Sequence, residues 1–172
     1  VSVAGAGRRV FLSLGSNVGD RRQFLAMARR ALAGLPDTRL VATSQIYETE
    51  PQDLETQSDY LNQVVCAETG LEPLALLGAT QDIEAAAGRV RNARFGPRTL
   101  DIDILLFEGV ESETPELTIP HPRMTHRAFV LAPLAEVWDL ARGMPAIPVG
   151  ELARRVSQAQ KVRRAPVTKV DP

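Results

Sequence analysis

The sequence is poor in cysteine, since Cys66 is the single one among 172 residues. One cysteine excludes an internal disulfide and any zinc site built from several cysteines. Because Cys66 lies in the apolar run NQVVCAE, we expect a buried side chain without a chemical role. His121 and His126 lack partners at zinc-site spacing, and packing in a loop would explain His121 as well as ligand binding would.

Long apolar stretches and a one-sided charge are also absent. The chain has no apolar run of about 18 residues, and its first residues, VSVAGAG, do not form a basic-then-apolar signal. We therefore expect a cytoplasmic protein with no membrane partner. The formal net charge of -1 argues against a nucleic-acid partner, because proteins that coat nucleic acid carry a large basic excess.

Several short signatures of phosphate chemistry are missing as well. No G-x-x-x-x-G-K-[ST] occurs, and neither H-R-D nor D-F-G is present, so the chain is neither a P-loop protein nor a protein kinase. Aromatic residues make up only 5% of the chain and form no block typical of an RNA-binding sheet.

The remaining composition is that of an ordinary globular protein. With 44% hydrophobic and 24% charged residues, the chain is long enough for one domain with its own core. We place that domain at residues 8-160 and expect a monomer. Residues 161-172 are polar and rich in proline and charge, which predicts a flexible tail.

Strand-like and helical patterns alternate along the chain. Apolar residues recur at helical spacing after Gly19 and Asp20 until Gly34, and again over 72-89. Runs rich in β-branched and aromatic residues predict strands over 8-15, 38-48 and 60-70 and in the run that ends at 107, and further helices are expected near 127-137 and 149-158.

This β-α-β-β-α-β order is typical of an α+β fold with a ferredoxin-like core. Such a core has a four-stranded antiparallel sheet with both helices on one face, and here it would carry extra C-terminal helices. The other sheet face would then be free to bind a ligand.

The segment GPRTLDIDILLF places two acids within a strand. Asp101 and Asp103 must share one face because strand side chains alternate, and carboxylates about 7 Å apart repel each other unless something positive lies near them. Arginines precede this strand, at positions 89, 91, 94 and 98. Paired carboxylates suit Mg²⁺ and arginines suit phosphate, so a nucleotide triphosphate site is one interpretation. A solvated acidic face paired with arginines is the other.

A family resemblance rests on six segments in order: LGSNVGD, SQIYETEP, DYLNQVV, QDIEAAAGRVR, FGPRTLDIDILLF and LTIPHPRMTHRAFVLAPLAEV. Their order and spacing resemble the 6-hydroxymethyl-7,8-dihydropterin pyrophosphokinase family of the folate pathway. The resemblance covers residues 8 to about 140 and implies the same ferredoxin-like fold.

The resemblance implies transfer of pyrophosphate from ATP to the hydroxymethyl group of the reduced pterin, with release of AMP. It makes Asp101 and Asp103 the ligands of two Mg²⁺ ions that bridge the ATP phosphates. It makes Arg89, Arg91 and Arg98 catalytic alongside the two aspartates, and it assigns ATP contacts to Gln81, Glu84, Arg89, Arg98, Ile104, Thr118, His121 and Arg127. A plain helix-surface pair is the alternative interpretation of Gln81 and Glu84.

The resemblance also implies a pterin site. It places Tyr60 and Phe129 on the two faces of the pterin and Asn62 and Thr49 at its polar edge. Phe95, where the best-known members have tryptophan, is assigned to the same site. Ordinary core packing is the alternative for Tyr60 and Phe129.

Two other functions remain as hypotheses. A metal-dependent nucleotide phosphohydrolase would use the same two aspartates but would need no pterin. A ferredoxin-like RNA-binding module would use the sheet face for base stacking, although two acids on that face would repel phosphate unless a metal were present.

Overall fold

The computed structural model describes residues 7-50, 58-89 and 98-168. The elements in chain order are β1 (Arg8–Ser16), α1 (Arg21–Ala33), β2 (Thr38–Thr43), β3 (Tyr47–Thr49), β4 (Tyr60–Thr69), α2 (Pro73–Ala86), β5 (Asp101–Phe107), β6 (Ser112–Glu113), β7 (Thr118–Ile119), η1 (Met124–His126), α3 (Ala128–Glu136), η2 (Trp138–Leu140), α4 (Val149–Ser157) and β8 (Val162–Arg164). Within these ranges no helix has the length and apolar character needed to cross a membrane.

The main sheet is antiparallel and contains six strands among the described residues, where the sequence predicted four. Its order is β5-β1-β4-β3-β8, and β2 also pairs with β4. The strand expected over 38-48 is in fact β2 and β3, which lie on different parts of β4. The break falls at Ser44, whose hydroxyl accepts the Val64 N–H, so a side chain replaces one rung of the backbone ladder.

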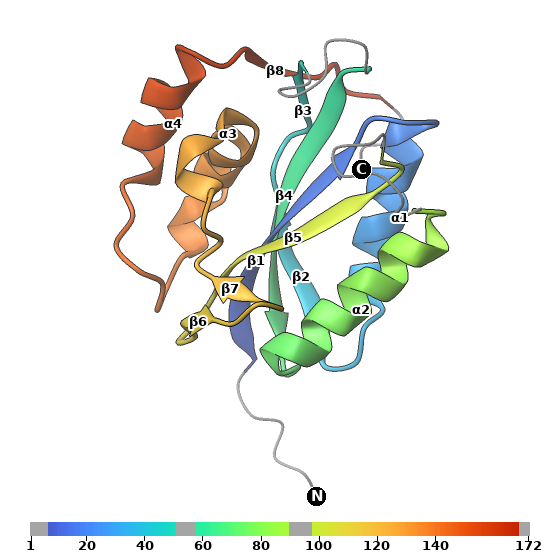
Figure 1. The fold of residues 1–172 in the computed structure, drawn as a ribbon, viewed down its shortest axis with the longest axis vertical. Coiled ribbons are helices and arrows are strands. Elements are labelled where there is room, and N and C mark those ends of the chain that lie inside the picture. Colours follow the sequence, from blue (N-terminus) through green and yellow to red (C-terminus); the bar gives the residue numbers. More distant parts are fainter. Residues whose placement is uncertain (1–6, 51–57, 90–97, 169–172) are drawn as a thin grey trace, which may run out of the picture.

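One face of this sheet is covered by α1 and α2 (Figure 1). Helix α1 begins where expected, because the Asp20 side chain accepts a hydrogen bond from the Gln23 N–H, and it ends at Gly34. Val10, Leu12 and other inward residues of the strands form the apolar core beneath the two helices. Burial of this continuous apolar surface is the main force that fixes the sheet.

The opposite face is covered in part by α3 and α4 (Figure 1). Phe11, Val64, Cys66 and Leu105 point to this side and pack with apolar residues of the two helices. Cys66 is fully buried, which confirms the expected burial of this residue. The expectation of a wholly free face is therefore wrong, and among the described elements α3 and α4 leave the part of the face beyond α3 uncovered.

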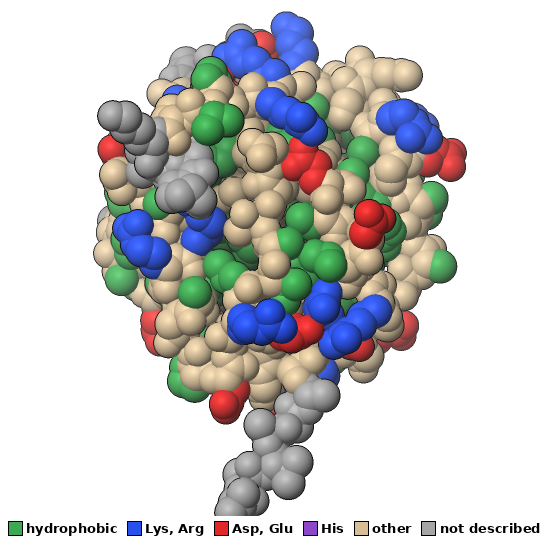
Figure 2. Space-filling view, turned by 180° about the vertical axis from the view of Figure 1, so that it is seen from behind, with side chains coloured by type: hydrophobic (Ala, Val, Ile, Leu, Met, Phe, Trp, Pro, Cys, Tyr) green, Lys and Arg blue, Asp and Glu red, His purple; other side chains and the backbone are tan. Residues whose placement is uncertain are grey.

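Figure 2 shows the molecule from behind, on the face turned away from the viewer in Figure 1. Basic, acidic and apolar side chains are interspersed there (Figure 2). Ion pairs of this kind are common among the described residues; Arg9, Arg39 and Arg142, for example, all contact Glu68. This face therefore offers no basic stripe of the kind that follows a nucleic-acid backbone.

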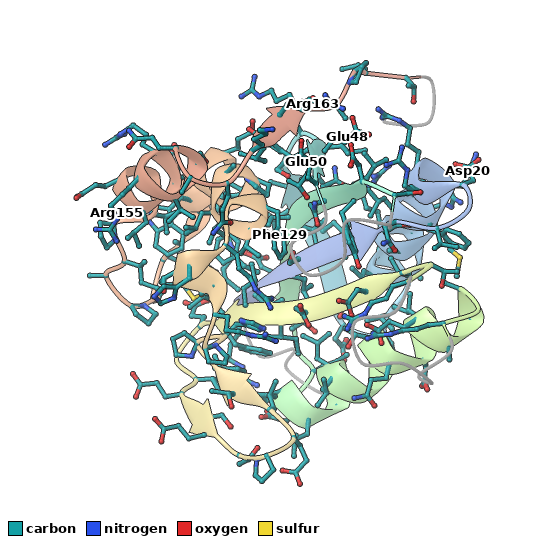
Figure 3. All side chains as sticks on the ribbon, turned by 45° about the horizontal axis from the view of Figure 1, so that its top comes forward. Asp20, Glu48, Glu50, Phe129, Arg155 and Arg163 are labelled. Atoms are coloured by element: carbon teal, nitrogen blue, oxygen red, sulfur yellow. The ribbon has the colours of Figure 1, made fainter. Side chains whose placement is uncertain are left out.

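Part of the expected flexible tail belongs to the sheet. Residues 162-164 form β8, which pairs with β3 in antiparallel register. Arg163 contacts Glu48 at 2.8 Å across this pair, and Glu48, Glu50 and Arg163 gather at this edge (Figure 3). The pairing joins segments more than a hundred residues apart, so no local sequence pattern could have indicated it.

Glu136 ties three elements together at the same edge. Its carboxylate accepts hydrogen bonds from the Gln45 N–H at 2.7 Å, from the Tyr47 hydroxyl at 2.7 Å and from Arg164 at 2.6 Å. The Glu136 side chain is only 20% exposed, so water could not fully replace these hydrogen bonds if they were broken.

We predict that Glu136→Ala lowers the free energy of unfolding by about 1-2 kcal/mol, because it leaves a backbone N–H and a buried hydroxyl short of an acceptor. Urea denaturation would measure the change. Glu116→Ala, at an exposed position, is the matched control and should change stability little. Equal effects of the two substitutions would contradict the prediction.

Candidate active site

The open part of the sheet carries the two aspartates on one face, as the sequence predicted. Ile102 and Ile104 point into the core on the other side, whereas Asp101 and Asp103 are only partly buried. Gly15 of β1 lies opposite Asp101 and also opposite Asn62 of β4. Because glycine has no side chain, none stands on this face between Asp101 and Asn62, and a Cβ at position 15 would lie 3.4 Å from the Asn62 Oδ1.

Asp101 is held by two arginines from the ends of the 89-98 segment. Arg98 contacts one carboxylate oxygen at 2.5 Å and Arg89 contacts the other at 2.8 Å. Arg89 also pairs with Glu84 of α2. The arginine pairing expected of a structural acid is therefore present at Asp101, although its side chain is only 20% exposed and does not form a solvated face.

Glu84 and Gln81 occupy different environments although they lie one helical turn apart. Glu84 is 3% exposed and accepts the Ile102 N–H at 2.8 Å, so it ties α2 to β5. Burial is the main cause that raises the pKa of Glu84, and the negative charge of Asp101 raises it further. Gln81 is exposed on the same helix. Glu84 is thus part of the framework that sets the position of Asp101.

Between the described residues, no ion pair joins Asp103 to an arginine in the way that Arg89 and Arg98 contact Asp101. Burial, followed by the negative charge of Asp101, raises the pKa of Asp103 to about 6. The positive charges of Arg127, Arg98 and Arg89 act in the opposite direction but do not cancel these effects. The charged form of Asp103 is therefore disfavoured, and a positive charge placed near it would favour that form.

Asn17 was not singled out as a site residue by the sequence, yet it fixes Arg98. Its side-chain oxygen accepts the Arg98 N–H at 2.8 Å, and its own N–H donates to the Arg98 carbonyl at 3.1 Å. Asn17 is 2% exposed and lies in the LGSNVGD segment after β1. The segment was noticed only as part of the resemblance, because the role of Asn17 depends on a partner 81 residues away.

Asn17 also lines a cavity of about 580 Å³ at this end of the sheet, with Val18, Gly19, Arg21, Glu48, Ser58 and Asp59. Arg21 crosses its wall, with contacts to Glu48 at 3.3 Å and to the Asp59 carbonyl at 2.6 Å. The cavity thus lies next to β3 and the start of β4, where the sequence placed part of the pterin site.

His121 stands beside the acid pair in a neutral form. Burial, then the charges of Arg127 and Arg123, lower the pKa of His121 to about 4. Its Nδ1 accepts the Arg123 N–H at 3.2 Å, which leaves the proton on Nε2. A neutral imidazole can donate one hydrogen bond to an anionic ligand without adding charge.

Arg127 and Phe129 come from the start of α3. The Arg127 guanidinium carbon lies 5.4 Å from the centre of the Phe129 ring, a cation–π contact. Phe129 is half-buried and extends from α3 toward the strands (Figure 3). An arginine and an aromatic ring therefore border the open face on the side opposite α2.

Two further predicted residues lie together at the β3–β4 pair. Asn62 donates from its amide nitrogen to the Thr49 hydroxyl at 2.9 Å, and both side chains are buried. Tyr60 lies opposite Thr49 in the register and is half-buried. The structure therefore brings Thr49, Tyr60 and Asn62 together.

The other predicted residues differ in their placement. Ile104 points into the core under α1 and α2, so its side chain cannot touch a ligand on the aspartate face. Thr118 lies in the two-residue strand β7 and is partly buried. Arg91 and Phe95 lie outside the described residues.

The donor set fits a hard divalent cation. Within the described ranges no group of three or more His, Cys, Asp and Glu side chains is placed to hold a metal. Two carboxylates without nitrogen or sulfur ligands suit Mg²⁺, which keeps water and binds phosphate oxygens in the rest of its shell. Acids, arginines and a neutral histidine around one open face describe a site for a metal-bound polyphosphate.

Comparisons with known proteins agree with this description. The sequence profile of the 7,8-dihydro-6-hydroxymethylpterin-pyrophosphokinase family matches residues 11-139. The chain belongs to this family. It is 48% identical over 127 residues to the 2-amino-4-hydroxy-6-hydroxymethyldihydropteridine pyrophosphokinase of Bacillus subtilis, which covers 74% of this chain and 76% of that protein. The enzyme of the same name from Pseudomonas aeruginosa is 47% identical over 130 residues, with coverages of 76% and 80%.

Solved structures show a similar fold. A structure of HPPK-DHPS in complex with substrates superposes with a TM-score of 0.72 at 12% sequence identity, over 97% of this chain and 49% of that one. The chain therefore spans about half the length of that matched structure. At this identity the likeness concerns the fold alone.

We predict that Asp103→Asn stabilises the protein at about pH 8, by about 2 kcal/mol, because it removes a buried charge that the fold disfavours. A carboxyl whose folded pKa is raised from 3.8 to about 6 destabilises the fold when ionised. The advantage of the variant should therefore shrink as the pH falls through about 6, because the folded carboxyl becomes protonated, and most of it should be gone near pH 4, close to the unfolded pKa of 3.8.

Thermal unfolding of both proteins in metal-free buffer from about pH 4 to about pH 8 would measure this difference. Asp82→Asn, at an exposed position of α2, is the matched control. A difference between Asp103→Asn and wild type that does not change with pH would contradict the electrostatic explanation.

Proposed function

We propose that this chain transfers the terminal pyrophosphoryl group of ATP to the hydroxymethyl oxygen of 6-hydroxymethyl-7,8-dihydropterin. The new bond joins that oxygen to the β-phosphorus, the bond from the β-phosphorus to the oxygen bridging it to the α-phosphorus breaks, and AMP leaves. The hydroxyl loses its proton in the same reaction. The observation that carries the proposal is the pair of aspartates on one open face, bordered by arginines, in a chain of this family.

Asp101 and Asp103 would hold Mg²⁺, and we infer two ions from the resemblance. When bound, Mg²⁺ neutralises the triphosphate and lowers the pKa of a coordinated hydroxyl. Arg89 and Arg98, now occupied by Asp101, would turn to the phosphate oxygens when a cation takes their place at that carboxylate. His121 and Arg127 would hold the same phosphates from the side of α3, and Glu84 would act through the position of Arg89.

The pterin would lie between Asn62 and α3. Asn62 offers both a donor and an acceptor to the amide-like edge of a pterin, and Thr49 orients it through the 2.9 Å hydrogen bond. Phe129 and Tyr60 would pack on the two ring faces. We infer the roles of Arg91 and Phe95 from the resemblance alone, since both lie outside the described residues.

We also infer that the centre of the sheet is ferredoxin-like. The chain order β1-α1-β2-β4-α2-β5 alternates as a split βαβ unit does, and all pairings within it are antiparallel. In this interpretation β3 and β8 are additions at one edge.

The reaction is tested by incubating the protein with ATP and Mg²⁺, with and without the pterin, and following AMP. We expect AMP and pterin pyrophosphate only when the pterin is present. Release of AMP or phosphate that is indifferent to the pterin would overturn the proposal in favour of a phosphohydrolase.

We predict that Asp101→Asn lowers kcat by about a thousandfold or more, because removing charge from a metal ligand weakens stabilisation of the transferring group. Asp82→Asn, also an aspartate change but on the surface of α2, should keep normal turnover. The AMP assay measures both. Activity of Asp101→Asn close to that of the control would exclude this residue as a metal ligand.

We predict that Phe129→Ala raises the Kd for the pterin by about tenfold and changes the Kd for an unreactive ATP analogue less, because a stacking surface is lost. Titration calorimetry with each ligand separates the two effects. Phe24→Ala removes a half-buried ring of the same size from α1, on the other side of the sheet, and serves as control. Equal losses for both ligands would contradict the stacking role.

A further inference from the structure

We propose that Gln160, in the segment after α4, is a positioning residue that fixes the direction of Arg127. This inference rests on the proposed function, in which Arg127 contacts the phosphates of ATP. Gln160 lies outside residues 11-139, the part of the chain that matches the family profile. It would therefore add a contribution to the site that the family's motifs do not contain.

The Gln160 amide forms hydrogen bonds on both sides of Arg127. Its oxygen accepts the Ala128 N–H at 2.9 Å, and its nitrogen donates to the His126 carbonyl at 2.8 Å. A primary amide is suited to this task because it carries one acceptor and one donor at a fixed separation.

Arg127 connects two helical segments, η1 and α3. Arg127 has extended backbone angles, φ -119° and ψ 111°, and it separates the last residue of η1 from the first residue of α3. Neither segment is capped by a side chain of its own flanking residue. Gln160 therefore supplies the missing cap of α3 and joins it to the end of η1, which sets the angle between them.

Gln160 is itself held in place from both directions. Its backbone N–H donates to the Val156 carbonyl at 3.1 Å, so it continues the end of α4, which packs against α3. Two residues later β8 begins, and β8 is paired with β3. A side chain anchored in this way can restrain a neighbouring loop, whereas a freely moving one could not.

The position of Arg127 matters because its charge acts on two site residues. It opposes the rise in the pKa of Asp103, and it contributes to the lowered pKa of His121. Its guanidinium also stacks on Phe129, only two residues further along. A change in the angle at this junction would move all of these contacts together.

The first test compares Gln160→Ala with Gln158→Ala in the AMP assay. Gln158 is exposed at the end of the same helix and is the matched control. We expect Gln160→Ala to lower kcat/KM for ATP by about tenfold, a loss typical of one or two hydrogen bonds, and Gln158→Ala to leave it unchanged. Gln160→Glu keeps the acceptor for the Ala128 N–H but places an oxygen against the His126 carbonyl. It should therefore cause most of the loss in kcat/KM that Gln160→Ala causes.

The second test separates positioning from general stability. In an Arg127→Ala background, Gln160→Ala should change kcat/KM for ATP by less than about twofold, because the residue through which it acts is absent. A further tenfold loss in that background, or normal activity of both Gln160 variants, would overturn the inference. An inactive wild-type protein would instead count against the proposed function, so the two failures are distinguishable.

Discussion

The repulsion between two carboxylates on one face of a strand is the constraint on which this structure depends. Asp101 and Asp103 are brought together by the two-residue period of β5, and that period is fixed because Ile102 and Ile104 are buried on the other side. The fold compensates unequally: Asp101 has arginines at 2.5 and 2.8 Å, whereas the pKa of Asp103 is raised to about 6 by burial and by its neighbour. This imbalance sacrifices some stability, as expected if the two acids hold a cation as proposed.

The division of the second sheet face into a covered and an open part follows from residue size and polarity. Apolar residues such as Phe11, Val64 and Leu105 lie where α3 and α4 pack. Further along the same strands, Gly15, Asn62 and Asp101 take their place, and no apolar helix can bury such a surface without cost. The polar end of the face therefore stays accessible, and the helices that cover the rest also deliver Arg127 and Phe129 to its border.

The sequence predicted those features that rest on local patterns. The helix from Asp20 to Gly34, the shared face of the two aspartates and the buried Cys66 were all correct, because capping, strand period and local hydrophobicity determine them. Its errors concern long-range pairing: the break between β2 and β3 depends on Ser44 and Val64, and β8 was assigned to a flexible tail. Asn17 and Gln160 were overlooked for the same reason, since each acts through hydrogen bonds to a distant segment.

If the site binds a cation and a polyphosphate as proposed, the arginine pairs imply that the two binding events favour each other. Arg89 and Arg98 both contact Asp101, so a phosphate that approaches alone would compete with that carboxylate for the same guanidinium groups. A cation that approaches alone meets an acid whose charge is already balanced by two arginines. When both arrive, the cation takes over the carboxylate and the arginines take over the phosphate, so every charge keeps an opposite partner. Such a coupling would be reciprocal by thermodynamic necessity, and it would arise from the same arginines that neutralise Asp101.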